Sequence, residues 1–362
     1  MQTDMHYYGT YALARAAGFK RDAAQAIATA SEYVDDSDEL HIQCKDGFEI
    51  HAEATAHHPS DYSANTNPQD QRRTWVPFHF IPGAQGASDE ERVVCVTDSA
   101  VARALVAHTL DSLNQPFGLP LLGILAHSFA DTFSHYGFSG ISSHLNRVDA
   151  RTLKIGDAAP GHESIGARMK LFADKYVVGP LANHLAQLGH GSVATFPDQP
   201  YLNWEFSYSD PVRPSGARPN PQTFLQACRR LHEVFMAARA KFNGVHDDPA
   251  AARDFADIEP TVQAILATTG DAEPRAAAWQ QASRDGKLGQ VAEPIPAYDH
   301  RRFTDDLKKL AGYDQAAAVH TPVCRFLQAA DFHRDYLLKE LLPSQGIQVE
   351  AIKIDWQTSA AV

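Results

Sequence analysis

The chain has 362 residues, of which 44% are hydrophobic and 21% are charged, and it carries a net charge of −12 at pH 7. The length allows one large domain or two domains. No apolar run approaches the roughly 18 residues that a membrane span requires, so we expect a soluble globular protein with no transmembrane segment. The negative charge argues against a long groove of Lys and Arg for nucleic acid, whereas a local cluster of cations can still hold a phosphate.

The cysteines and the first residues bear on the cellular compartment. The four cysteines lie far apart and form no CxxC pair, so we expect free thiols rather than a disulfide framework or a zinc knuckle. The start of the chain, MQTDMHYYGTYALARAAGF, lacks a basic region followed by an apolar core, and no secretory signal is visible. We expect a cytoplasmic protein, or one exported by a route without a conventional signal peptide.

Two short helices are predicted at the beginning of the chain. The first covers residues 7–17 and is ended by Gly18, and the second covers residues 22–34 and is rich in alanine. Asp35 and Asp36 follow the second helix. Negative charge is unfavourable at the carbonyl end of a helix. A bound cation would explain the two acids.

The next segment changes from helical to alternating patterns. Residues 41–55 alternate as a strand does, with Asp46 and Gly47 as the turn, which predicts a β-hairpin insertion near residues 40–55. Residues 59–71 are polar and loop-like. In the following stretch, WVPFHFIP, His79 lies between two phenylalanines and two prolines. We expect this histidine to be buried or to bind a ligand.

The most informative stretch is LPLLGILAHSFADTFSHYGF, residues 119–138. His127, Asp131 and His135 recur every four residues within it, which on a helix places all three on one stripe. A carboxylate in such apolar surroundings is costly to bury unless it is neutralised, and a divalent metal does so. The alternative is a single buried ion pair or a half-exposed polar stripe.

A later glycine- and proline-marked loop contains His190 and Asp198. His144 and His162 also lie in loop-like contexts. Aromatic residues follow the loop and form either a face for a cationic ligand or, as is more common, part of the core. These aromatic residues are Tyr201, Trp204 and Tyr208.

Residues 211–222 carry four prolines and are the best candidate for a domain boundary. Beyond them, helical periodicity indicates core packing, beginning with a helix from Asn220 to Gly244. Because 13 of the 18 histidines lie at or before His190, we place the chemistry in residues 1–210. Residues 211–362 are expected to pack on this catalytic region as further helices, either as a separate part or within one continuous domain. The expected fold class is all-α with the small hairpin insertion.

In their order along the chain, these motifs resemble the superfamily of zinc-dependent phospholipases C and single-strand-specific zinc nucleases. The shared order is an early histidine, a helix-end aspartate, an isolated histidine, a helical HxxxDxxxH, and a later histidine and acid. The resemblance covers roughly the first 210 residues and rests on motif order. It implies an all-α metallohydrolase core that holds two or three zinc ions.

The resemblance also implies a role for individual residues. Asp35 matches the helix-end aspartate, with Asp36 as the fallback, and His79 matches the isolated histidine. Asp131 matches the aspartate that bridges two zinc ions, and His6 completes the paired site. Asp35 would act both as ligand and as general base. The implied metal ligands are Asp4, His6, Asp35, His79, His127, Asp131, His135, His190 and Asp198.

One departure from the family concerns the N-terminus. The family uses the free amino group of a processed N-terminus as a ligand, which we do not expect here because Met1 is retained. Asp4, two residues before His6, is the expected substitute, because an extended DxH segment aims both side chains the same way.

Two further departures concern spacing. The second helix histidine of the family usually lies six residues after the aspartate, whereas His135 lies four residues after it. The last histidine and acid of the family are four residues apart on a helix, whereas His190 and Asp198 are eight apart. His162 with Glu163, and His144, therefore stay open as candidates for the last ligands.

The expected function is a zinc-dependent phospholipase C that releases phosphocholine from phosphatidylcholine, similar to the bacterial branch that lacks a signal peptide. Such an enzyme touches the membrane surface transiently and binds no nucleic acid stably. Histidine nitrogen and carboxylate oxygen suit zinc, although manganese or iron stays open. One alternative is a zinc nuclease or 3'-nucleotidase, which would stack a base on an aromatic side chain. Another is a non-catalytic protein stabilised by its metals.

Overall fold

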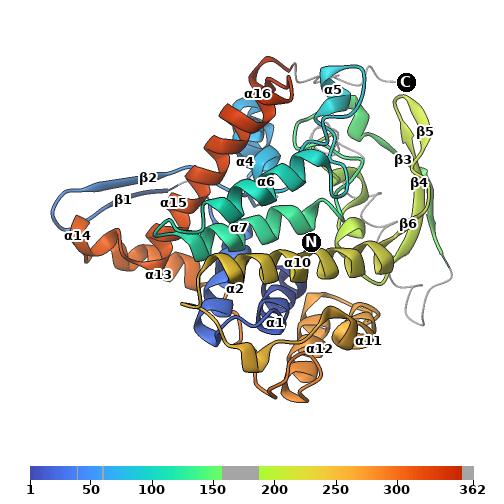
Figure 1. Cartoon of the computed structure of the whole chain (residues 1–362). Coiled ribbons are helices and arrows are strands. Elements are labelled where there is room, and N and C mark those ends of the chain that lie inside the picture. Colours follow the sequence, from blue (N-terminus) through green and yellow to red (C-terminus); the bar gives the residue numbers. More distant parts are fainter. Residues whose placement is uncertain (39, 59–60, 157–186, 353–362) are drawn as a thin grey trace.

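The computed structural model describes the chain from 1 to 362 except residues 39, 59–60, 157–186 and 353–362. The fold is helix-rich, with two small antiparallel sheets at opposite ends of a helical body (Figure 1). No helix of the described residues combines the length and the apolar character that crossing a bilayer demands. All four cysteines are buried free thiols, as expected.

Helix α7 (Gly118–Asp131) occupies the centre of the body and is packed by helices on several sides. The helices against it are α2 (Arg21–Asp36), α4 (Pro68–Phe78), α6 (Ala100–Asp111), α10 (Asn220–Lys241) and α15 (Pro322–Asp335). The contact with α2 is the most extensive, and Gly123 permits it. A Cβ at Gly123 would meet the carbonyl oxygen of Ile27 and lie 2.8 Å from the Cβ of Ala30. This close approach brings the end of α2 beside the end of α7.

The first residues form a continuous buried segment. A π-helix, η1 (Asp4–Gly9), runs directly into α1 (Thr10–Ala16), and Gly18 follows with φ of 91°. The predicted first helix is therefore present, although it begins three residues earlier than expected. The N-terminus lies in the middle of the helical body (Figure 1).

The predicted hairpin is confirmed and consists of β1 (Leu40–Gln43) and β2 (Glu49–Ala52). The prediction of a loop over residues 59–71 is wrong. The described part of this segment contains α3 (Tyr62–Thr66) and the first turn of α4. Asn67 caps α4 through its side chain, and Pro68 occupies the first helical position. We missed these helix-start signals because we interpreted the polar composition of the segment as that of a loop.

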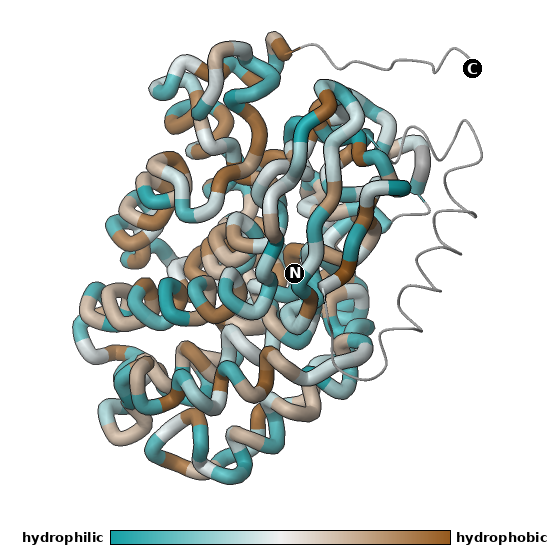
Figure 2. The backbone as a smooth tube through the Cα atoms, turned by 90° about the vertical axis from the view of Figure 1, so that its right-hand side faces the viewer, coloured by the Kyte–Doolittle hydropathy of each residue, from teal (hydrophilic) through white to brown (hydrophobic). Residues whose placement is uncertain are grey.

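The expectation of an all-α fold apart from the hairpin is confirmed only in part, because the body is helix-rich but a second sheet lies at its other end. Its strands are β3 (Val148–Ile155), β4 (Asn203–Ser209), β5 (Val212–Pro214) and β6 (Arg218–Pro219). β4 pairs with all three of the others. Alternate residues of β4 are buried, and hydrophobic and hydrophilic residues alternate along the strands that face the viewer in Figure 2. Residues 211–222 thus belong to the sheet and to the start of α10.

The remaining described elements are helical. They are α5 (Asp89–Arg92), η2 (His144–Asn146), η3 (Gly191–Val193), η4 (Phe196–Asp198), η5 (Pro249–Ala251), α11 (Phe255–Leu266), α12 (Ala272–Arg284), α13 (Arg302–Leu310), α14 (Gln315–Ala318), η6 (Tyr336–Leu341), α16 (Leu342–Ser344) and η7 (Val349–Ala351). α12 packs on η1, and α10 packs on α1. Side chains from both sides of the expected boundary at residue 210 therefore share one hydrophobic core.

We expect Gly123→Ala to destabilise the protein. The added methyl group gains about 1 kcal/mol of helix propensity, but it must push against the backbone of α2, and overpacking of this kind typically costs about 1–3 kcal/mol. Urea denaturation of the variant and the wild type measures the difference. Gly289→Ala is the matched control, because a methyl group there would meet no atom closer than 3.7 Å. Equal stability of the two variants would contradict the close packing of α2 and α7.

Candidate metal centre

The carboxylate of Asp131 lies at the end of α7 with no exposure to solvent. Oδ1 is 2.6 Å from the α-amino nitrogen of Met1 and 3.2 Å from His6 Nε2. Oδ2 is 3.4 Å from both His79 Nδ1 and His127 Nε2. Burial raises the pKa of Asp131, but the surrounding nitrogens outweigh it and hold that pKa well below its usual range. A single ionised carboxylate therefore joins several nitrogen donors.

The first set of donors, the Asp35 group, comprises Asp35, His79 and His127 around Asp131 Oδ2. His79 Nδ1 and His127 Nε2 are 3.2 Å apart. Zinc bonds of about 2.0–2.1 Å in a tetrahedron require ligand atoms about 3.3–3.4 Å apart. The three distances among these two nitrogens and Oδ2 therefore fit three corners of one coordination sphere. Asp35 Oδ1 lies 3.9 Å from His79 Nδ1 and 3.8 Å from His127 Nε2, on the side of the fourth corner.

The protonation of these two imidazoles follows from their outer partners. His127 Nδ1 donates to the carbonyl of Ser31 at 2.8 Å, and His79 Nε2 donates to the carbonyl of Thr55 at 2.9 Å. Because carbonyl oxygens only accept, the outer nitrogens carry hydrogens, and a ring without a second proton turns the lone pair of its inner nitrogen towards the other ring. Two facing lone pairs repel unless a cation lies between them. Carbonyl partners of this kind are what orients histidines that bind metals.

The second set, the His6 group, comprises His6, the α-amino nitrogen of Met1 and Asp131 Oδ1. The His6 ring stacks on that of His127, with centroids 3.7 Å apart. Burial, followed by the charges of neighbouring groups, lowers the pKa of His6 to about 3, so the ring is neutral. In the described part of the chain, His6 Nε2 and Asp131 Oδ2 are buried without a hydrogen bond. Both atoms are suited to accept a cation.

The amino group at Met1 occupies the place that we expected Asp4 to fill. Burial lowers its pKa, but the carboxylates of Asp131, Asp198 and Asp35 outweigh burial and raise it to about 11. The group is therefore an ammonium ion in the absence of metal, and it offers a lone pair only when the proton is displaced. One ammonium neutralises one carboxylate and leaves the facing nitrogens of His79 and His127 without a cation.

Asp4 is not part of this centre. Arg275, on α12, donates from Nε to Asp4 Oδ2 at 2.8 Å, and both side chains are buried. The same guanidinium also bonds to the side chain of Gln2. We therefore leave Asp4 out of the candidate ligands. Its role is to hold the segment between Met1 and His6.

The third set, the His135 group, comprises His135, His190 and Asp198. His135 Nε2 is 3.0 Å from Asp198 Oδ1, and the amino nitrogen of Met1 is 3.3 Å from the same oxygen. The outer nitrogens donate to carbonyls, His135 to that of His79 at 2.9 Å and His190 to that of Ala194 at 2.6 Å. Burial lowers the pKa of His190 to about 4, which keeps the ring neutral. The structure thus brings His190 and Asp198 to His135 despite their wide spacing in the sequence.

The four-residue spacing predicted that His135 lies on the same helix as His127 and Asp131. The structure places it just after the end of α7. The helix ends at Asp131, and His135 follows in a turn whose backbone nitrogen still donates to the carbonyl of Asp131 at 2.8 Å. Buried Arg218 supports this turn by donating to the carbonyls of Ser134 and Tyr136, each at 2.9 Å. Sequence reasoning missed Arg218, since an arginine within a proline-rich stretch carries no such signal.

The aromatic residues after the loop belong to the core. Tyr201, Trp204 and Tyr208 are buried in a cluster with Phe138 and Phe206. The guanidinium of Arg218 lies 5.0 Å from the Trp204 ring and 3.8 Å from the Tyr136 ring. The cation beside the Trp204 ring is therefore the side chain of Arg218 and not a bound ligand.

Asp36, the fallback for Asp35, faces a different set of groups. Tyr298 donates its hydroxyl hydrogen to Asp36, and His300 Nδ1 is 3.9 Å from the Asp36 carboxylate. Glu32, one turn earlier on α2, is buried and accepts from Thr3 at 2.5 Å. We call Glu32, Asp36, Tyr298 and His300 the acidic neighbour of the centre.

His144, which the sequence left open as a last ligand, pairs with an acid outside the three donor groups. Its Nδ1 lies 3.4 Å from Glu90 in a partly exposed ion pair. His162 and Glu163, also left open by the sequence, lie outside the described residues. Among the described residues, His190 and Asp198 are therefore the pair that completes the His135 group.

The candidate ligands differ in their access to solvent. The side chain of Asp35 is 37% exposed to solvent, whereas those of Asp131 and His127 are fully buried. Of the candidate ligands in the Asp35 group, Asp35 is therefore the one that solvent reaches.

The carbonyl of Thr55, which orients His79, lies two residues before His57. The side chain of His57 anchors this segment. This buried histidine bridges two carboxylates, with Nδ1 2.9 Å from Asp38 and Nε2 2.5 Å from Asp70. Burial alone would lower the pKa of His57, but the two carboxylates raise it above its ordinary value. The bridge fixes the chain two residues after Thr55.

We expect the contribution of His57 to stability to depend on pH. Because its pKa is higher in the folded chain than the about 6.5 of an unfolded one, the added stability is complete below pH 6.5 and is lost as the pH rises through the folded pKa. Urea unfolding at about pH 6 and pH 9 should therefore show a larger loss for His57→Gln at the lower pH. Exposed His320→Gln is the control. A loss that is equal at both pH values would refute the charged bridge.

Comparison with known proteins identifies a family, but the function of that family is unknown. A family of unknown function, DUF6765, matches residues 1–341, a range that contains all three donor groups. No curated protein and no solved structure matches the chain.

Proposed function

The chain belongs to the DUF6765 family, and we propose that it is a zinc-dependent phosphodiester hydrolase, a phospholipase C that releases phosphocholine from phosphatidylcholine. The observation that carries the proposal is the convergence of histidine nitrogens on the two oxygens of Asp131. The distances among His79 Nδ1, His127 Nε2 and Asp131 Oδ2 match three corners of one metal coordination sphere. The His6 and His135 groups supply donors for one ion each.

The donors suit zinc because they are imidazole nitrogens and carboxylate oxygens, together with one amine. When bound, zinc would supply Lewis acidity at a phosphoryl group and would lower the pKa of a water molecule towards neutrality. Asp35 is the residue best suited to accept the proton from that water, because its carboxylate is the open edge of the centre. The sealed carboxylates of Asp131 and Asp198 would hold the ions in place.

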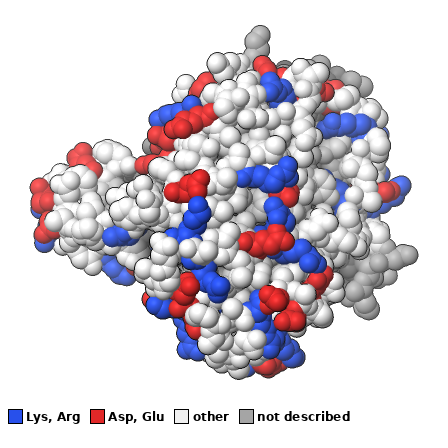
Figure 3. Space-filling model, in the orientation of Figure 1, with Lys and Arg blue, Asp and Glu red and all other residues white. Residues whose placement is uncertain are grey.

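Two observations favour a phospholipid with a cationic headgroup over a nucleic acid. The acidic neighbour lies beside Asp35, and its partly exposed Asp36 carboxylate and its Tyr298 ring are the groups that would attract a quaternary ammonium. The face in Figure 3 intersperses Lys and Arg with Asp and Glu and shows no continuous basic stripe. A long polyanion normally requires such a stripe.

Metal content provides the first test. We expect His6→Gln to lower the zinc content by about one equivalent per chain, because the variant removes one nitrogen of the His6 group. An extension left on the N-terminus should have a similar effect, since it removes the amino group from Asp131. Elemental analysis of the purified proteins measures both changes.

His232→Gln is the matched control for this experiment. His232 is also buried, but its ring donates to the carbonyl of Arg253, away from the centre. Its zinc content should equal that of the wild type. Unchanged zinc in His6→Gln would remove the His6 group from the proposal, and the absence of any bound metal in the wild type would refute the metal centre.

Turnover provides the second test. The wild type should release phosphocholine from a phosphatidylcholine analogue, lose this activity with a chelator and regain it with zinc. Asp35→Asn keeps the size of the side chain but removes the proton acceptor, so we expect kcat to fall by on the order of 10². Asp36→Asn is the matched comparison, because Asp36 faces Tyr298 instead of the donors.

The outcomes of the turnover test separate the candidate functions. Cleavage of single-stranded nucleic acid or 3'-nucleotides, without cleavage of choline lipid, would replace the phospholipase with a nuclease. Absence of both activities in a metal-replete protein would favour a metal-stabilised binding protein. Full activity of Asp35→Asn would contradict the role of Asp35 as base.

A further inference from the structure

A second cluster of metal-type donors lies on the hairpin, outside the buried centre. His41 on β1 is directly opposite His51 on β2, and their rings stack with centroids 4.2 Å apart. Glu49 precedes His51 by two residues on β2, so both side chains point to the same face of the hairpin. Strand pairing therefore brings two imidazoles and a carboxylate together.

The distances within this cluster suit a metal ion. His41 Nε2 and His51 Nε2 lie 3.7 Å and 3.5 Å from the same oxygen of Glu49, Oε2. The separation expected for ligands of one tetrahedral zinc ion is about 3.3–3.4 Å. Small rotations of exposed side chains close this difference. Three ligand atoms and one open position are the arrangement of an exchangeable site rather than of a closed structural one.

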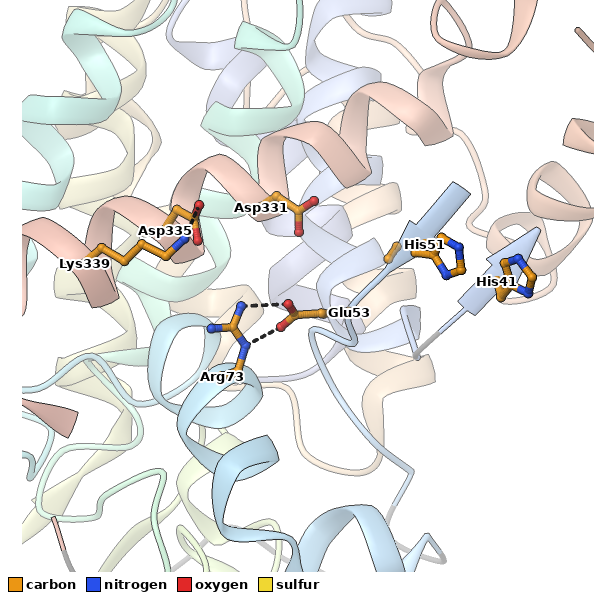
Figure 4. Close-up of a pocket in the computed structure, with 8 residues that line it drawn as sticks. His41, His51, Glu53, Arg73, Asp331, Asp335 and Lys339 are labelled. Atoms are coloured by element: carbon orange, nitrogen blue, oxygen red, sulfur yellow. Dashed lines mark hydrogen bonds and ion pairs between the residues drawn. The ribbon is translucent and has the colours of Figure 1, made fainter. Parts of the chain in front are cut away.

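The surroundings leave the cluster accessible. About half or more of each side chain is exposed, 55% for His41, 68% for His51 and 49% for Glu49. The two histidines border a pocket of about 600 Å³ between the hairpin and the helices α15 and η6 (Figure 4).

Charged side chains line the rest of this pocket. Asp331, Asp335 and Lys339 come from the helical side, and Glu53 and Arg73 form an ion pair below them (Figure 4). Carboxylates outnumber the cationic groups among these five residues, three to two. Each carboxylate already has a basic partner, Asp331 with Arg334, Asp335 with Lys339 and Glu53 with Arg73, so the pocket adds little net charge to the three ligands.

We propose that His41, Glu49 and His51 form a surface site for a divalent first-row transition ion, with zinc as the probe ion. The site is separate from the buried centre and does not depend on the proposed hydrolase activity. The ion joins the two strands of the hairpin, which extends away from the helical body beside α13 and α14 (Figure 1). Imidazole with carboxylate selects such ions over magnesium and calcium, which prefer oxygen ligands.

Zinc binding tests the site directly. Purified protein is saturated with zinc, passed through a desalting column and titrated with zinc in a calorimeter. We expect the wild type to bind one weakly held equivalent, and His41→Gln and His51→Gln to bind it at least about 10-fold more weakly, since even an outer partner of a ligand commonly contributes that factor. His320→Gln, which removes an exposed histidine elsewhere, should behave as the wild type.

Proteolysis at the turn gives an independent readout. Lys45 is the sole lysine or arginine between Arg21 and Arg72, so tryptic cleavage of the hairpin produces one distinctive nick. Zinc should slow this nick in the wild type and in His320→Gln, but not in His41→Gln. Equal zinc affinity of the wild type and both hairpin variants, with equal rates of nicking, would overturn the proposal. Because neither measurement uses turnover, an enzymatically inactive protein would not contradict the proposed hairpin site.

Discussion

The burial of the Asp131 carboxylate is the constraint on which the rest of the structure depends. An ion that leaves water loses several kcal/mol of solvation even after the protein relaxes, and only opposite charge restores it. Imidazole nitrogens surround Asp131, but the ammonium of Met1 contacts only one of its two oxygens. The second oxygen faces His79 and His127 without a hydrogen bond from the described residues. A metal ion satisfies this oxygen and both nitrogens at once.

Elements far apart in the sequence hold the donors at their positions. Backbone carbonyls orient four imidazoles, and these carbonyls belong to Ser31, Thr55, His79 and Ala194. Arg275 holds the first residues of the chain, and Arg218 holds the turn that carries His135. Both arginines follow residue 210, so the later helices and the sheet do more than cover the core. They set the geometry of a site whose candidate ligands all precede them.

Much of the fold and of the site could be predicted from the sequence, because side-chain periodicity and residue type are local properties. The helices, the hairpin and the three donors at positions 127, 131 and 135 were visible in this way. Asp4 was misassigned because spacing alone cannot show that Arg275, 271 residues later, occupies its carboxylate. The second sheet was missed because we interpreted the aromatic residues of β4 as a ligand-binding face or as part of the core and did not consider their alternation along a strand. The amino group of Met1 carries no side-chain signal, so only the packing of η1 against α2 and α12 places it.

The two donor clusters use the same kinds of ligand but differ in what fixes them. In the buried centre, carbonyl hydrogen bonds fix the tautomer and the orientation of each of four rings before any ion arrives. On the hairpin, strand pairing and ring stacking position His41 and His51, and among the described residues no carbonyl bond orients either ring. Preorganised ligands in a sealed site bind tightly and exchange slowly, whereas mobile exposed ligands release their ion readily. We therefore expect an ion at the buried centre to be held tightly and an ion on the hairpin to exchange readily.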